Sequence, residues 1–213
     1  KALSQLVTKY EQEDEPLFVA NCYRAIAYTQ FEQENYGLAF ENNFRALEIY
    51  KKTGFDNVPE IVKFLHEMAL KHFYFKDYKQ VITLMHRAIK LPKYNDVIEI
   101  QCYNNLGLAY SRIQERDSAV FYLNKAYTLA DKYESNSWKA IASGNIGTIY
   151  YDLKEYDQAY EHYKKLYQYG KDQLDHIIRL TSYVYMSKVY LKLDSIALAK
   201  EYIQKVDISL KQL

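Results

Sequence analysis

The feature that most constrains this chain is an internal repeat that aligns without a gap. The segments 103–110 (YNNLGLAY) and 143–150 (SGNIGTIY) carry a glycine at the same point, and an alanine follows each glycine 12 residues later. Each repeated unit of this kind forms one supersecondary structure that stacks on its neighbours. The sequence therefore predicts an array of similar helical units. The two glycine–alanine pairs are Gly107 with Ala119 and Gly147 with Ala159.

Three weaker copies of the same pattern extend it over nearly the whole chain. Small residues recur because packed helices lie about 8–10 Å apart and leave little room at their closest approach. We therefore expect leucine at Ala119 or Gly147 to overpack the interface by about 1–3 kcal/mol. The small positions are Ala27, Ala69, Gly107, Gly147 and Ser187 in the first helices, spaced by 42, 38, 40 and 40 residues, then Ala39, Val81, Ala119, Ala159 and Ala199, and finally Ala46, Ala88, Ala126, Leu166 and Val206.

These residues resemble the tetratricopeptide repeat (TPR) pattern, in which a large residue, Leu-Gly, Tyr, Ala, Phe and Ala recur across a helix–turn–helix. The chain departs from it by lacking the tryptophan and most terminal prolines, and by a period near 40 residues instead of about 34. The resemblance implies an all-α fold, a right-handed superhelix (α-solenoid) of about five repeats in a single domain, 1–213. We expect a tail helix of a truncated preceding repeat at 1–14 and repeats at 16–54, 58–92, 96–134, 137–172 and 175–213.

Residues typical of helix ends agree with this division. Pro16 and Pro59 suit the first turn of a helix, and Ser137 suits the start of a first helix. Gly54 suits a helix end, where a left-handed conformation is common.

Composition restricts the function classes. Only 3 prolines and 6 glycines occur among 213 residues, which favours long helices with short connections. With 28 basic and 27 acidic residues the net charge is +1, so a nucleic-acid partner is not expected. No apolar run reaches the roughly 18–20 residues that span a bilayer, so membrane insertion by this segment is not expected. A cytoplasmic location is favoured, and a periplasmic one stays open if a signal peptide has been removed.

The 24 tyrosines suggest either an aromatic ligand surface or wide helix interfaces. Nine of them occupy template positions that face neighbouring helices, which favours the second interpretation and predicts core positions for them. These are Tyr23, Tyr36, Tyr78, Tyr103, Tyr110, Tyr150, Tyr156, Tyr183 and Tyr190.

Nothing in the sequence predicts catalysis. The segment 66–70 (HEMAL) begins like the zinc-protease motif HExxH, but Leu70 replaces the second histidine, and zinc needs about three converging protein ligands. Cys22 and Cys102 are too few for a disulfide framework or a zinc site. His72 falls at a buried template position and is expected to be a hydrogen-bonded core residue. We therefore expect no catalytic residues, no metal and no cofactor.

The resemblance to TPR proteins also implies a ligand surface. In that family the first helices line a concave groove, and an asparagine at the position of Asn105 and Asn145 often bonds a peptide backbone. The alternative is that these asparagines only bridge adjacent repeats. The carboxylate clamp of chaperone-binding members is only partly matched, by Arg24 and Asn105. The candidate groove residues are Arg24, Tyr28, Phe31, His66, Phe73, Asn104, Asn105, Arg112, Asn145, Tyr151 and Lys188.

The function that follows is a non-catalytic scaffold that binds a protein or peptide in this groove. Its alternative is a sensory or regulatory segment of a larger bacterial signalling protein or transcriptional regulator, because the long period also resembles such TPR segments. The dipeptide Asn104–Asn105 before Leu-Gly resembles kinesin-light-chain repeats in particular. RNA binding predicts a basic groove, and acidic Glu32, Glu67 and Asp152 near this face count against it.

Overall fold

The computed structural model describes residues 2–92, 95–170 and 176–211. Over these residues the chain forms eleven α-helices and one 3₁₀ helix, with no strand. The helices are α1 (Ala2–Gln12), α2 (Pro16–Glu32), α3 (Tyr36–Thr53), the 3₁₀ helix η1 (Phe55–Asn57), α4 (Ile61–Tyr74), α5 (Tyr78–Ala88), α6 (Asp96–Arg112), α7 (Arg116–Lys132), α8 (Asn136–Asp152), α9 (Tyr156–Gly170), α10 (His176–Lys192) and α11 (Ile196–Leu210).

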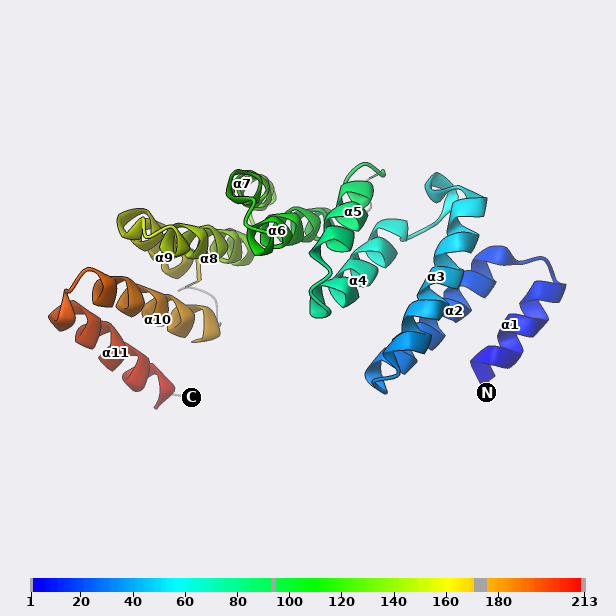
Figure 1. Ribbon diagram of the computed structural model, residues 1–213, viewed down its shortest axis with the longest axis horizontal. Coiled ribbons are helices and arrows are strands. Elements are labelled where there is room, and N and C mark those ends of the chain that lie inside the picture. The colour runs from blue at the N-terminus through cyan, green and yellow to red at the C-terminus, as the bar shows by residue number, and fades with distance from the viewer. Residues whose placement is uncertain (1, 93–94, 171–175, 212–213) are drawn as a thin grey trace.

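The helices form successive antiparallel pairs that stack into an arch (Figure 1). The pairs are α2 with α3, α4 with α5, α6 with α7, α8 with α9, and α10 with α11, and α1 packs on α2 at one foot of the arch. The fold is thus an all-α repeat superhelix. Four of the five pairs fall within a range expected for a repeat, and α8 begins one residue before its range, at Asn136. The division into five repeats and a preceding tail helix stays a prediction.

The small positions of the repeat explain how each pair closes. All fifteen are buried except Val206, which is half-buried. A Cβ atom added at Gly107 would lie 2.5 Å from Cγ of Leu123 and 3.0 Å from the carbonyl oxygen of Ala119. One added at Gly147 would lie 2.7 Å from Cε1 of Tyr163. At both crossings a side chain of the second helix already occupies the space that a Cβ would need.

The turn inside each pair repeats with the same geometry. The residue seven positions after each first-helix small residue has a positive φ, between 53° and 65° in all five turns. The next amide donates to a carbonyl at the end of the first helix, as Glu115 N does to Tyr110 O at 3.0 Å, which satisfies a helix-end acceptor. These five residues are Glu34, Lys76, Gln114, Lys154 and Asp194.

Two of the four expected helix-end residues, Pro16 and Gly54, lie where they were predicted. Pro16 is the first residue of α2, and Gly54 ends α3 with φ of 84°. Pro59 lies two residues before α4 begins. The expectation for Ser137 is wrong, because Ser135 accepts the backbone N–H of Trp138 and caps α8. Ser137 lies inside the first turn.

The nine tyrosines that were expected in the core are all half-buried. Six of them pack against the buried core clusters, namely Tyr23, Tyr78, Tyr103, Tyr110, Tyr150 and Tyr156. Half-burial suits tyrosine, whose ring is apolar and whose hydroxyl is polar. His72 is buried as expected, with Nδ1 lying 3.1 Å from Oδ2 of Asp77 and the ring 5.0 Å from that of Phe40.

Candidate functional site

The first helices α2, α4, α6 and α8 carry a periodic series of polar contacts between neighbouring repeats. We call this series the polar ladder. Each rung joins the first helices of two consecutive repeats. One of its residues lies three positions before the small residue of its own first helix, and the other lies two positions before the small residue of the next first helix. The rungs are Arg24 with Glu67, His66 with Asn105, and Asn104 with Asn145.

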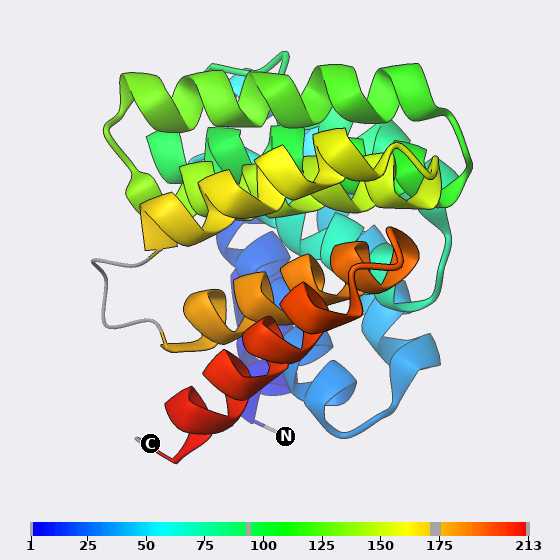
Figure 2. The same cartoon turned by 90° about the vertical axis from the view of Figure 1, so that its left-hand side faces the viewer.

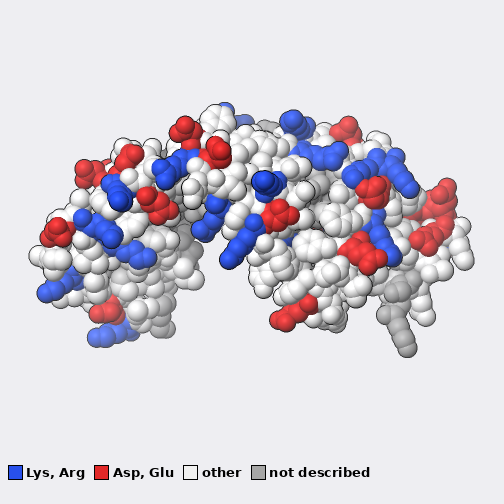
Figure 3. Space-filling view, in the orientation of Figure 1, with Lys and Arg blue, Asp and Glu red and all other residues white. Residues whose placement is uncertain are grey.

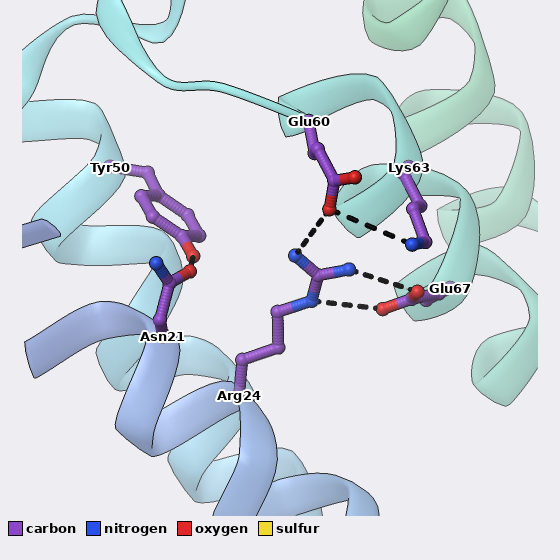
Figure 4. Close-up of polar contacts among 6 residues, drawn as sticks. All are labelled: Asn21, Arg24, Tyr50, Glu60, Lys63 and Glu67. Carbon is purple, nitrogen blue, oxygen red and sulfur yellow. Dashed lines mark hydrogen bonds and ion pairs between the residues drawn. The ribbon is translucent and has the colours of Figure 1, made fainter. Parts of the chain in front are cut away.

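The first rung is an ion pair with two hydrogen bonds (Figure 4). Arg24 donates from Nε to Oε2 of Glu67 at 3.0 Å and from a terminal nitrogen to Oε1 at 2.9 Å. Its other terminal nitrogen lies 3.8 Å from Glu60, which also lies 3.6 Å from Nζ of Lys63. Burial works against the charged guanidinium, but Glu67 outweighs it and raises the pKa of Arg24. Arg24 therefore stays positively charged, and the carboxylate of Glu67 balances its charge.

The next two rungs are uncharged. Nδ2 of Asn105 lies 3.0 Å from Nε2 of His66, and because an amide nitrogen only donates, this imidazole nitrogen accepts. Burial lowers the pKa of His66, which agrees with a neutral ring. Nδ2 of Asn145 donates to Oδ1 of the buried Asn104 at 2.8 Å. The asparagines therefore do bridge adjacent repeats.

The ladder stops at the last junction. The equivalent positions there hold Gly144 and Tyr185. The ring of Tyr185 stacks on that of Tyr163, with centroids 4.7 Å apart. At this last junction the polar contact between repeats is thus replaced by an aromatic one.

A depression of about 580 Å³ opens beside the first rung, between α2 and α4. Arg24 and Lys71 contribute two positive charges to it, and Glu60 and Glu67 contribute two negative ones. Tyr28 stands at its wall with 63% of its surface exposed. The arch is hollowed below its centre, and charges of both signs are interspersed over the face in Figure 3. The depression therefore offers mixed charge and an aromatic side chain.

Two stretches of the chain, residues 100–133 and 140–169, match the sequence model of the tetratricopeptide repeat. The chain contains tetratricopeptide repeats. No curated protein matches the sequence. The TPR is the repeat of a protein-interaction scaffold, and the two matched stretches coincide with the helix pairs α6–α7 and α8–α9.

Solved structures share the fold over nearly the whole chain. Aspartyl phosphate phosphatase F from Bacillus subtilis superposes with a TM-score of 0.81 at 16% identity, over 98% of this chain and 56% of that chain. MamA from Desulfovibrio magneticus gives 0.67 at 15% identity, over 91% and 96%. The TPR-like repeats of a putative kinesin light chain from Podosopora anserina give 0.73 at 15% identity, over 92% and 97%. This chain thus spans just over half the length of the phosphatase.

The TPR positions expected to form the groove divide into three groups. Arg24, His66, Asn104, Asn105 and Asn145 are brought together as the polar ladder, with His66 and Asn104 buried. Their side chains hold neighbouring repeats together. The groove interpretation assigned them to ligand contact and did not include this role.

A second group stays accessible. Tyr28 is exposed in the depression, and Lys188 is exposed, with Nζ 5.6 Å from the centre of the Tyr185 ring. Arg112 lines a separate depression of about 250 Å³ near the end of α8. These residues are spread along the arch and do not form one cluster.

The third group is aromatic and packs against neighbours. Phe31 is half-buried, 5.9 Å from the ring of Tyr74. Phe73 is half-buried, packs against the core cluster and lies 5.3 Å from the ring of Tyr78. Tyr151 is half-buried against Tyr156. Their spacing along the helices did not predict that neighbouring aromatic rings bury part of their surface.

Sequence reasoning placed Glu67 near the groove face but did not pair it with Arg24. Glu67 shares its template position with Asn105 and Asn145, so the repeat spacing contained the signal that it pairs with the preceding helix. Glu60 carries no such signal, because it lies outside the helices with φ of 57° just before α4.

The described part of the chain shows no group of three or more His, Cys, Asp or Glu that could hold a metal ion. Cys22 and Cys102 are free and buried, and burial raises the pKa of Cys102 to about 12, which disfavours a reactive thiolate. None of the described helices is long and apolar enough to cross a membrane.

Proposed function

We propose that this chain is a non-catalytic TPR scaffold that binds an extended segment of a partner protein along its first helices, centred on the depression between α2 and α4. The observation that carries this proposal is the depression itself, which opens directly beside the polar ladder. Its volume of about 580 Å³ falls in the range of ligand sites, about 300–1,000 Å³.

The amide rungs support recognition of a peptide backbone. An asparagine side chain offers two N–H donors and a carbonyl acceptor, and each rung uses one of the donors. Asn105 and Asn145 are half-buried, so their remaining capacity can reach a main-chain N–H or C=O laid along the helices. The ladder then both joins the repeats and presents amides at the spacing of the repeat.

Exposed tyrosines supply the anchoring contacts. Tyr28 and Tyr74 each expose 63% of their surface, on α2 and α4. Tyrosine is enriched at interface hot spots, where a large rigid ring is buried at low entropic cost. Tyr28 lines the depression, and Tyr74 lies at the end of α4 beside Phe31.

The charges of the depression favour a partner segment of mixed or low charge. Arg24 is engaged by Glu67 and Glu60, so it does not act as a free cation for a carboxylate terminus. Lys71 is the other cation, and burial lowers its pKa. We therefore disfavour both a carboxylate-clamp role and a nucleic-acid partner.

The test is a peptide array probed with the wild-type chain and three double variants. Tyr28→Ala/Tyr74→Ala removes the anchors and should weaken bound peptides by at least about 30-fold, since one hot-spot truncation alone costs about 2 kcal/mol. Asn105→Ala/Asn145→Ala should also weaken them. The matched control is Phe44→Ala/Phe121→Ala, which removes exposed aromatics from the second helices α3 and α7.

Thermal unfolding of each variant shows whether the array is intact. Peptides that bind wild type and the tyrosine double variant equally well would contradict the proposed anchors. Equal binding by the asparagine double variant would show that the ladder only joins repeats. Loss in the control variant alone would place the partner on the second helices.

A second candidate is a regulatory segment of a larger signalling protein. The observation that favours it is the fit of nearly the whole chain to just over half of the Bacillus subtilis phosphatase. The complete reading frame decides between the two: flanking effector domains support the regulatory segment, and their absence supports an independent scaffold.

A further inference from the structure

A separate pocket of about 460 Å³ lies among α9, α10 and α11, the helices nearest the viewer in Figure 2. It is lined mainly by the second helices α9 and α11, whereas the polar ladder lies on the first helices α2, α4, α6 and α8. Its volume falls within the range of small-ligand sites, about 300–1,000 Å³. Its tyrosine and lysine side chains are Tyr160, Lys164, Tyr167, Tyr183, Tyr202 and Lys205.

The tyrosines form apolar walls that end in hydroxyl groups. The rings of Tyr167 and Tyr183 lie 5.4 Å apart, and the hydroxyl oxygens of Tyr160 and Tyr202 lie 3.5 Å apart. Burial and the neighbouring Tyr167 hydroxyl raise the pKa of Tyr183 to about 12. Burial, with the Tyr160 hydroxyl next, also raises the pKa of Tyr202. These phenols stay protonated at neutral pH and can donate hydrogen bonds.

The charged groups that line the pocket are both cations. Lys205 sits over the ring of Tyr202, with Nζ 4.4 Å from its centre. The acidic neighbours, Glu161 and Glu201, pair with Lys164 at 3.9 Å and Lys205 at 2.7 Å but do not line the pocket. Exposed ion pairs within one helix are weak, so an anion in the pocket can compete with them for the lysines.

The preceding repeat serves as an internal comparison. Residues 40 positions earlier occupy the equivalent places between α7, α8 and α9, and most of them are not tyrosine or lysine. Only Tyr127 and Lys165, the equivalents of Tyr167 and Lys205, are kept there, so stacking of the repeats does not require the full tyrosine–lysine set. The equivalents of Tyr160, Lys164, Tyr183 and Tyr202 are Val120, Asn124, Ser143 and His162.

We infer that this pocket binds a small ligand or peptide terminus in which an oxyanion, carboxylate or phosphate, is joined to an apolar or aromatic group. The lysines and phenol hydroxyls donate to the oxyanion, and charge-assisted hydrogen bonds of this kind are the strong ones. The tyrosine rings contact the apolar part. The site is independent of the proposed groove.

The test is calorimetric titration of the full chain at low salt with three probes of similar shape: phenyl phosphate, benzoate and neutral benzyl alcohol. Either anion, or both, should bind and benzyl alcohol should not. Binding should weaken as NaCl is added, because the interaction is partly electrostatic. A preference between the two anions identifies the oxyanion that the site takes.

Two double variants locate the binding. Lys164→Gln/Lys205→Gln should weaken it about 10-fold or more, with the glutamines keeping length and polarity. The matched control is Lys125→Gln/Lys132→Gln, whose lysines also lie over aromatic rings, at 5.6 Å from Phe121 and 5.1 Å from Tyr133, but outside the pocket. It should bind as wild type does.

Three results would overturn the inference: no binding of either anion to wild type, equal binding of benzyl alcohol, or unchanged binding in Lys164→Gln/Lys205→Gln. Loss in both double variants to the same extent would also overturn it, since it would indicate general charge attraction. Peptides found for the groove between α2 and α4 should bind Lys164→Gln/Lys205→Gln as they bind wild type, which separates this test from that of the proposed function.

Discussion

The central repeats, α6 to α9, and the N-terminal ones, α2 to α5, solve the same packing problem with different residues. The central crossings use Gly107 and Gly147, whereas the N-terminal ones use the buried alanines Ala27 and Ala69. The sequence model of the TPR matches the central repeats but not the N-terminal ones. The superhelix is nevertheless continuous across both regions (Figure 1).

A second template position shows the same divergence. In the central repeats, the residues three positions after the small residues of the two paired helices stack their rings. Tyr110 stacks on Tyr122 with ring centroids 5.3 Å apart, and Tyr150 stacks on His162 with centroids 5.4 Å apart. The first repeat instead joins Asn42 to Gln30 by a hydrogen bond of 2.9 Å. Aromatic stacking and an amide hydrogen bond each link the two helices of a pair, so this position accepts more than one kind of contact.

The rungs of the polar ladder follow the same rule between repeats. The rung in the N-terminal region is charged, the rung to the central region joins His66 to Asn105, and the central rung joins two amides. Charged rungs respond to salt, histidine rungs respond to pH, and amide rungs respond to neither. This difference gives each region its own experimental signature.

The largest expected effect comes from filling a central crossing. Gly107→Ala places a Cβ against Leu123 and the backbone of Ala119, and overpacking of this kind costs about 1–3 kcal/mol. We expect the free energy of unfolding, measured in urea at 25 °C, to fall. Gly37→Ala is the matched control: no atom lies within 4 Å of the added Cβ, and alanine favours helix by about 1 kcal/mol, so stability should rise.

The reverse substitution sharpens the comparison. Ala27→Gly removes a buried methyl group and adds backbone freedom, so it should also destabilise, by about 1 kcal/mol. If Gly107→Ala matched Gly37→Ala in stability, the central crossing would have room for a Cβ after all. A neutral Ala27→Gly would show that the Ala27 methyl group does not stabilise the N-terminal crossing.

The next effect is that of the charged rung. Arg24→Gln leaves Glu67 and Glu60 without their guanidinium partner, and we expect a loss of about 1 kcal/mol at low salt, the upper range for a partly exposed pair. The loss should shrink at about 1 M NaCl, where screening acts over about 3 Å. Asn145→Ala, which breaks the amide rung, should cost about 0.5–1.5 kcal/mol at both salt concentrations.

Urea unfolding at the two salt concentrations measures both losses. An Arg24→Gln cost that does not change with salt would show that the guanidinium acts through packing, for example against Phe64, whose ring centre lies 5.8 Å away. A salt-dependent cost for Asn145→Ala would contradict the assignment of an uncharged rung.

The sequence was sufficient for the fold because its signal is periodic. The small residues at fixed spacing predict the helix pairs and their closest contacts, and almost all of these positions are buried. The repeat also placed Arg24, Asn105 and Asn145 on one face. Periodicity assigns a position to each residue, but it does not state whether that side chain contacts a ligand or the next repeat.

The partner of each polar side chain depends on distances between helices, which a single sequence does not contain. Asn104 was assigned to the groove, yet it is buried as the acceptor of Asn145. Phe73 was also assigned to the groove, yet it is half-buried, with its ring 5.3 Å from that of Tyr78, five residues later. The pocket among α9, α10 and α11 escaped notice because its tyrosines come from three helices.

The smallest expected effect is the pH response of the rung that joins the two regions. Burial lowers the pKa of His66, and Glu67 only partly offsets this, so the folded chain favours the neutral ring. The unfolded chain binds the proton near the ordinary pKa of about 6.5. Proton uptake therefore favours unfolding, and stability should fall as the pH drops through about 6.5.

His66→Gln isolates this contribution, because the glutamine carbonyl can still accept from Asn105 but does not titrate. The melting temperature of the variant should fall less than that of wild type between pH 7.5 and pH 5.5 (about one unit either side of the ordinary histidine pKa). His86 and His162, whose pKa values burial also lowers, retain part of the response. An unchanged slope in His66→Gln would mean that the imidazole is not held neutral by the rung, and that the junction between the two regions has no pH-sensitive contact at this position.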